Sequence, residues 1–281
     1  MLMVKPEVTN TDIMSRLQST FTELKKRGDA ALIPFITAGD PAPEATVELI
    51  RTLAAAGADV IELGIPFSDP MADGPTIQAA SERALAAGTS LASVLRIVTE
   101  ARRDVQLPLV LMGYYNPVFR YGIERFAVDA VAAGVDGLLL VDLPPEEMEE
   151  IRPACAAAGL PLITLMAPTT PPERMARLAA TAEGYIYYVS MTGVTGTQAV
   201  SPTDIRDSVD QLKQMTQIPV AVGFGITTAA DARAVAEFAD GVVVGSALVR
   251  IIAEYGHENE LSARVTAFTV ALKEGCKRKA I

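Results

Sequence analysis

One unit recurs along the chain and constrains its fold more than any other feature. It joins an Ala-rich amphipathic helix, a Gly with an Asp or Pro close by, and a short apolar strand. Four copies are LAAAGADVIELG (53–64), VAAGVDGLLLVD (131–142), AAAGLPLITLM (156–166) and AEFADGVVVGS (236–246). A Gly after an Ala run is a common left-handed helix end, and strands of Val, Ile and Leu are typical of parallel sheets buried on both faces. The unit therefore predicts parallel strands that alternate with helices.

Eight segments fit the strand of this unit. They are 31–36, 58–64, 107–112, 136–141, 161–166, 185–190, 218–223 and 241–245. Helices fill the gaps, with Pro43, Pro75 and Pro202 in first-turn positions. An extra helix is predicted at 11–27 and a long one at 259–277.

Eight alternations favour an α/β fold, a single (β/α)8 TIM barrel with an extra N-terminal helix. We expect one domain over 1–281, with residues 1–10 poorly ordered. An open doubly wound sheet is the alternative, but its usual GxGxxG after the first strand is replaced by FITAGDP.

Composition and charge limit the ligands. The net charge of −10, with no basic stripe beyond KRK at 277–279, argues against nucleic acid and requires a local device to hold a phosphate. No run approaches the roughly 18 apolar residues of a membrane span, and the N-terminus lacks a signal-peptide layout. Cys155 lies in a predicted helix and Cys276 in a basic tail. Two distant cysteines make no disulfide framework, so we expect a reducing, cytoplasmic location.

The active site of such a barrel lies at the C-terminal ends of the strands, where Glu62 stands out. It lies within the apolar strand VIELGI. Burying a carboxylate there is costly unless it is paired, and burial would raise its pKa towards neutrality, which suits proton transfer. The alternative is that Glu62 forms a purely structural ion pair with a buried Lys or Arg, although no predicted strand contains a basic residue.

The loop that follows, PFSDPMADGPTIQ (66–78), exceeds the two to six residues usual for a βα connection. It carries Asp69 and Asp73. One interpretation is a solvated turn, since Asp, Pro and Gly are common turn residues. The other is a working pair, in which Glu62 moves protons while Asp73 stays ionised and binds a donor or a developing positive charge.

Three Gly-bearing segments follow the last three strands: TGVTGT (192–197), GFGI (223–226) and GSA (245–247). Barrels often hold a phosphate there with loop amides and a helix N-terminus. None of the three contains Lys or Arg, which favours binding by neutral amides.

The remaining candidate residues are not expected to take part in catalysis or metal binding. His257 is the only histidine and is expected at the surface, and no cluster has metal-ligand spacing. The following basic residues are expected to be solvated helix ends: Lys25, Lys26, Arg27, Arg102 and Arg103.

Seven motifs resemble one known family. They are PFITAGDP (34–41), GADVIELGIPFSDPMADGPTIQ (57–78), LMGYYNPVFRYG (111–122), GLLLVDLPPEE (137–147), YYVSMTGVTGT (187–197), VGFGI (222–226) and GSALV (245–249). In this order, from about residue 11 to the C-terminus, they resemble the tryptophan synthase alpha subunit. The second motif is long and close to a signature of that family.

The resemblance implies a (β/α)8 lyase that cleaves indole-3-glycerol phosphate to indole and glyceraldehyde 3-phosphate by a retro-aldol reaction without a cofactor. The family's catalytic glutamate and aspartate fall on Glu62 and Asp73. The implied phosphate contacts are Gly196, Gly225, Gly245 and Ser246. The implied substrate pocket holds Phe35, Tyr114, Leu139, Tyr187, Thr195 and Phe224.

The resemblance also implies two mobile loops, 66–73 and 190–199, with Thr195 meeting Asp73 on closure. Well-known members read serine-arginine-serine-glycine where this chain reads Ser190-Met191-Thr192-Gly193, so an arginine contact is missing.

The family works with a beta subunit that carries pyridoxal phosphate, in an alpha2beta2 hetero-tetramer. The implied interface includes Pro66 to Met71 and the loop near Asn116 and Pro117. A stand-alone lyase that releases free indole is an alternative. A non-catalytic barrel that only activates a beta partner is another, against which the intact Glu62 and Asp73 argue.

Overall fold

Eight short parallel strands form the centre of the structure, a computed structural model that describes residues 14–189, 202–223 and 225–278, without the side chains of 202–204. The strands are β1 (Ala31–Thr37), β2 (Ile61–Gly64), β3 (Leu109–Gly113), β4 (Gly137–Leu140), β5 (Thr164–Met166), β6 (Ile186–Val189), β7 (Val220–Gly223) and β8 (Gly241–Val244). They are hydrogen-bonded in the order β4-β3-β2-β1-β8-β7-β6-β5. A parallel bridge between Leu138 and Leu162 joins the two ends. The predicted barrel is therefore confirmed, and the open sheet is wrong.

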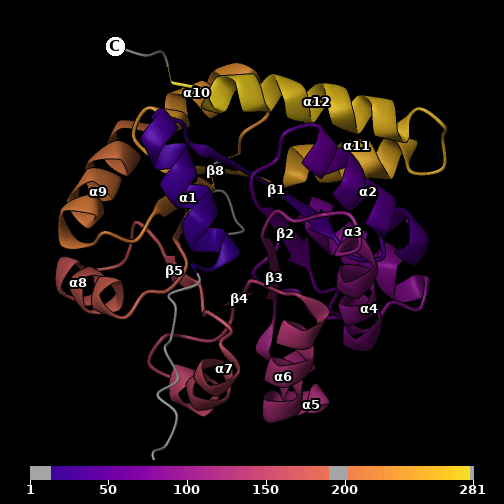
Figure 1. Ribbon diagram of the computed structural model, residues 1–281, viewed down its shortest axis with the longest axis horizontal. Coiled ribbons are helices and arrows are strands. Elements are labelled where there is room, and N and C mark those ends of the chain that lie inside the picture. The colour runs from indigo at the N-terminus through magenta and orange to yellow at the C-terminus, as the bar shows by residue number, and fades with distance from the viewer. Residues whose placement is uncertain (1–13, 190–201, 224, 279–281) are drawn as a thin grey trace, which may run out of the picture.

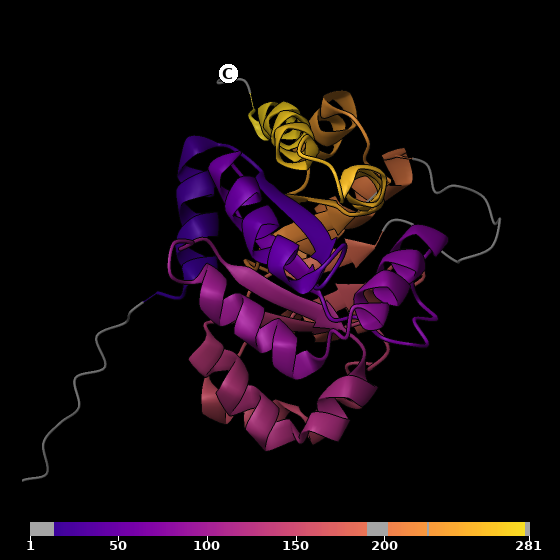
Figure 2. The ribbon, with the colours of Figure 1, turned by 90° about the vertical axis from the view of Figure 1, so that its right-hand side faces the viewer.

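Helices surround the strands (Figures 1 and 2). Those of the first half are α1 (Arg16–Arg27), α2 (Pro43–Ala55), α3 (Pro75–Ala86), α4 (Leu91–Ala101), α5 (Tyr115–Tyr121) and α6 (Ile123–Ala133). Those of the second half are the 3-10 turn η1 (Met148–Glu150), α7 (Arg152–Ala158), α8 (Pro172–Ala180), α9 (Pro202–Met215), α10 (Ala229–Ala236), α11 (Ser246–Tyr255) and α12 (Leu261–Cys276). The expectation for residues 1–10 lies outside the described residues.

Local sequence signals set the ends of these helices. Pro43 and Pro75 are first residues of α2 and α3, where a missing N–H costs nothing. Gly134 and Gly159 end α6 and α7 at φ of 95° and 76°, the left-handed region that favours glycine. The helix–Gly–strand unit thus acts as the sequence predicted.

The extra helix α1 packs against the barrel interior. Leu17, Phe21 and Leu24 belong to one buried cluster with inward side chains of the strands, and the Phe21 ring lies 5.8 Å from that of Tyr185. A larger apolar layer lies between the strands and the outer helices, and includes Leu53 of α2. Since α1 fills the interior from one end, the opposite end remains for a site.

The expectation of a solvated helix end is wrong for Arg102. The Arg102 side chain is only 10% exposed, because it pairs with Asp136 and donates to the carbonyl oxygens of Gly134 and Leu107. Cys276 is the last residue of α12, within the predicted helix 259–277, and is buried directly before the basic residues that follow it.

Within the described ranges, no single helix is long and apolar enough to cross a membrane. Only α3 and α4 taken together reach that length and composition, and they are bent by 93°.

Candidate active site

A cavity of about 530 Å³ opens at the C-terminal ends of the strands. Ligand sites of comparable size are typical of enzymes. Its lining comes from the ends of the strands and the loops after them: Phe35, Glu62, Ala72, Asp73, Gly74, Ile77, Met112, Val141, Leu165, Tyr187, Val189, Gly223, Gly225, Ile226, Thr227, Val243, Gly245, Ser246, Ala247 and Arg250. Both predicted carboxylates and three of the predicted phosphate residues therefore share one cavity.

Glu62 lies on β2 in register with Phe35 of β1 and is fully buried. Its Oε1 accepts a hydrogen bond from the Tyr185 hydroxyl at 2.5 Å. Its Oε2 has no partner among the described residues. Burial raises the pKa of Glu62 to about 8, and the hydrogen bond from Tyr185 opposes this only in part. The carboxyl is therefore mostly protonated at neutral pH, as a proton donor must be.

Asp73 lies on the loop after β2 and is half-buried. Its Oδ2 accepts a hydrogen bond from the Tyr114 hydroxyl at 2.9 Å, and that hydroxyl accepts one from the Ala72 amide at 3.0 Å. Gln78 of α3 donates to the Asp73 carbonyl oxygen at 2.9 Å. Burial raises the pKa of Asp73, opposed by the Tyr114 hydrogen bond. Tyr114, directly after β3, thus holds the Asp73 carboxylate at the rim, and Gln78 of α3 holds its backbone.

Aromatic rings form the walls between the two ends of the cavity. A Cβ on Gly64 would lie 2.5 Å from Phe35 Cζ, and one on Gly223 would lie 2.3 Å from the Tyr187 hydroxyl oxygen. Only glycine leaves room for these rings. Burial raises the pKa of Tyr187, and the charges of both Glu62 and Asp73 raise it further. A flat apolar group would fit between these walls.

The opposite end of the cavity is suited to an anion. Gly245 precedes α11 without a side-chain cap, and Ser246 is the first residue of that helix. The first amides of α11 are therefore not capped by a side chain, and helix amides in this position attract negative charge. Gly225 after β7 adopts φ of 38°, which a side chain disfavours.

Several predicted residues lie elsewhere or are not described. Leu139 is fully buried in the interior cluster with the α1 side chains, and Val141, two residues further along the same face, lines the cavity. Tyr114 lies behind Asp73, with its ring 5.1 Å from that of Phe67. Gly196, Thr195 and Phe224 lie outside the described residues, as does the Met191-Thr192 departure.

Two residues of the site, Tyr185 and Arg250, are not among those predicted from the sequence. Tyr185 lies directly before β6 and precedes Tyr187 by two positions, and the alternation of side chains along a strand could have revealed it. Arg250 follows Ser246 by four positions, which is one helical turn, and lines the cavity.

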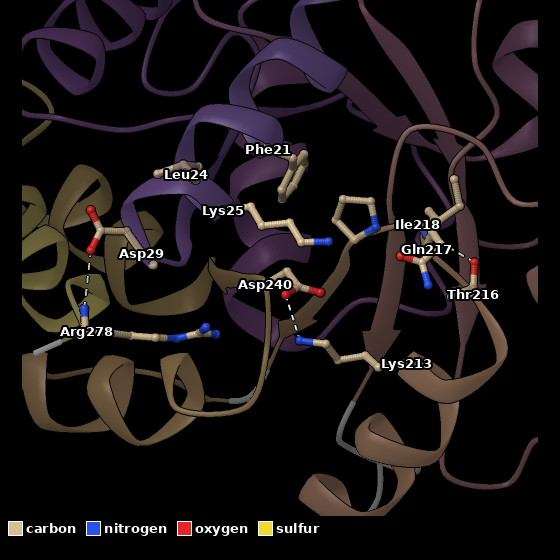
Figure 3. A pocket seen from close by; sticks show the side chains of 12 residues that line it. Phe21, Leu24, Lys25, Asp29, Lys213, Thr216, Gln217, Ile218, Asp240 and Arg278 are labelled. Carbon is tan, nitrogen blue, oxygen red and sulfur yellow. Dashed lines mark hydrogen bonds and ion pairs between the residues drawn. The ribbon is translucent and has the colours of Figure 1, made fainter. Parts of the chain in front are cut away.

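A second cavity, of about 280 Å³, includes residues of α1 and the connections that lead into β7 and β8 (Figure 3). Two of its three basic side chains, Lys213 and Arg278, have partners within the fold. Lys213 lies 2.7 Å from Asp240, which also accepts from the Val220 amide, and Arg278 donates to the carbonyl oxygens of Ala236 and Ala239. This second cavity lies apart from the cavity that contains Glu62 and shares no lining residue with it.

No group of three His, Cys, Asp or Glu side chains in the described ranges could hold a metal ion. Fold and site together define a class: a (β/α)8-barrel enzyme whose cavity holds a buried carboxyl of raised pKa, aromatic rings and the N-terminus of a helix without a side-chain cap.

Comparisons with known proteins name the family. The family profile described as tryptophan synthase alpha chain matches residues 21–277. The tryptophan synthase alpha chain of Geotalea uraniireducens is 53% identical over 264 residues, covering 94% of this chain and 98% of its own. That of Xanthomonas euvesicatoria is 55% identical over 268 residues, covering 95% and 100%. The crystal structure of subunit alpha from Legionella pneumophila matches with a TM-score of 0.86 and 44% identity, covering 94% and 98%.

The chain belongs to the tryptophan synthase alpha chain family. It is accordingly a lyase of tryptophan biosynthesis that cleaves indole-3-glycerol phosphate. The family name denotes one chain of a larger enzyme and so implies a beta-chain partner.

Proposed function

We propose that Glu62 is the proton donor and acceptor of this cleavage and that Asp73 orients the indole. The observation that carries the proposal is the complete burial of Glu62 at the cavity floor, with its pKa raised to about 8. Since Tyr185 occupies Oε1, Oε2 is left to carry the proton towards the cavity.

In the proposed steps Glu62 both donates a proton and takes one back, so no other acid or base is required. The carboxylic acid protonates indole C3, which makes the ring a leaving group. The bond between C3 and the glycerol chain then breaks, and its electrons return to the ring. The adjacent hydroxyl becomes the aldehyde and its proton returns to the Glu62 carboxylate. One placed proton-transfer group contributes about 10²- to 10⁴-fold.

Asp73 would accept a hydrogen bond from the indole N–H as positive charge grows on the protonated ring. The Tyr114 hydroxyl on Oδ2 supports this role, because it fixes the carboxylate and leaves Oδ1 for the substrate. The phosphate would bind at Gly225, Gly245 and Ser246, and also at Gly196, with Thr195 closing on Asp73. No cofactor takes part in these steps, and pyridoxal phosphate is proposed only in the beta partner.

The partner would be a beta chain in an alpha2beta2 assembly. Exposed apolar side chains after neighbouring strands support an interface at the mouth: Met71 is 77% exposed and Phe119 is 55% exposed. Pro66 to Met71 and the segment at Asn116 and Pro117 belong to the same rim. Buried free thiols at Cys155 and Cys276 fit a reducing compartment, and we propose the cytoplasm.

The test is turnover of indole-3-glycerol phosphate by the purified chain, alone and with a tryptophan synthase beta chain. We expect slow cleavage alone and a large acceleration with the partner. Fast release of free indole without a partner would instead support a stand-alone lyase. A Glu62→Gln variant that cleaves at a near-normal rate would remove Glu62 from the mechanism.

A further inference from the structure

Arg250 is the only basic residue among the described residues that line the cavity. The two acidic residues of the lining, Glu62 and Asp73, belong to β2 and the loop after it, whereas Arg250 belongs to α11. The cavity therefore carries its acids on one segment and its single cation on another.

The position of Arg250 directs its side chain to the anion end. It follows Ser246 by four residues, so both lie on one face of α11. Long side chains on a helix lean back towards its N-terminus, over the preceding turn. That turn begins at Gly245 and Ser246, both of which line the same cavity.

Arg250 has no competing partner in the described part of the chain. It is exposed and makes no hydrogen bond or ion pair with any described residue, whereas most other arginines of the fold are paired, such as Arg83 with Asp40 at 2.7 Å. Free guanidinium groups are well suited to phosphate, which they bind through paired N–H donors.

We infer that Arg250 is a binding residue for the phosphate of the substrate, in addition to the neutral amides. This inference rests on the proposed function, and it supplies the local attraction that a chain of net charge −10 needs to hold a dianion. The sequence favoured binding by amides alone. The structure adds a cation one helical turn away from them.

The test compares Arg250→Gln with the complete enzyme, beta chain included. We expect KM for indole-3-glycerol phosphate to rise roughly 5- to 20-fold while kcat changes less than about twofold, since an exposed pair is partly screened. Arg250→Lys should recover part of the loss. The ratio of kcat/KM between wild type and Arg250→Gln should shrink as salt rises from about 20 to about 300 mM, because the Debye length shortens.

Arg96→Gln is the matched control. Arg96 is exposed on α4 and lines an outer groove between α2 and α4. Its replacement by Gln removes the same charge from the protein without changing the cavity that contains Glu62. Inhibition by inorganic phosphate gives a second readout, which does not involve the indole half of the substrate, and its inhibition constant should rise in Arg250→Gln only. An unchanged KM and inhibition constant in Arg250→Gln, or equal effects in Arg96→Gln, would overturn the inference. Either result leaves the proposed function intact, because that function is tested separately by Glu62→Gln, Asp73→Asn and the response to the beta chain.

Discussion

Replacing Glu62 by Gln should change catalysis and stability in opposite directions. Gln has the same shape and keeps an oxygen that can accept the Tyr185 hydrogen bond. It cannot supply a proton, so cleavage should fall by about 10²- to 10⁴-fold. Substrate binding should persist, since the phosphate end of the cavity is unchanged.

The stability effect follows from the two pKa values. An unfolded Glu ionises near 4.5, and folded Glu62 ionises near 8. As pH rises between these values, the unfolded chain releases a proton that the folded protein retains, so wild-type stability falls. The stability that the folded state gains from keeping Glu62 protonated is fully present below pH 4.5 and is lost as the pH rises towards about 8. At 1.36 kcal/mol per pKa unit, the wild type loses about 1 kcal/mol by pH 5 and about 3 kcal/mol by pH 7.

Glu62→Gln lacks this loss, so its advantage in the free energy of unfolding should grow by about 3 kcal/mol from pH 5 to pH 7. Urea unfolding followed by circular dichroism at both pH values measures the difference. A gain that is the same at every pH would refute the burial argument. Normal turnover in the same variant would refute the assignment of Glu62 as the acid.

Three further variants test the surrounding residues. Asp73→Asn should lose roughly 10- to 10³-fold in kcat but keep its affinity for inorganic phosphate, and an unchanged rate would exclude Asp73 from the chemistry. Tyr185→Phe removes the hydrogen bond that lowers the pKa of Glu62, so the alkaline limb of the pH–rate profile should move above about 8, and a limb that stays in place would contradict the contact. Arg102→Met leaves Asp136 buried with one partner fewer and should cost about 3 kcal/mol in unfolding experiments, whereas a loss below about 0.5 kcal/mol would show that the pair is dispensable.

Much of the barrel could be predicted because its signals are local. A proline starts α2 and α3, and a left-handed glycine ends α6 and α7. Each of these residues sets a helix end through its own backbone conformation. The apolar runs between them predict buried parallel strands for the same reason. Glu62 was found by the same logic, since a carboxylate in such a run is out of place.

The partners of the site residues could not be predicted, because they depend on which strands become neighbours across the barrel. Tyr185 is 123 residues from Glu62, and Tyr114 is 41 residues from Asp73. Arg102 resembles a solvated helix end in the sequence until the fold places it against Asp136, 34 residues away. The sequence by itself determined the alternation of strands and helices and marked an unusual buried acid. Only the tertiary structure decided that a tyrosine holds this acid, and that an arginine one turn into α11 lines the far end of its cavity.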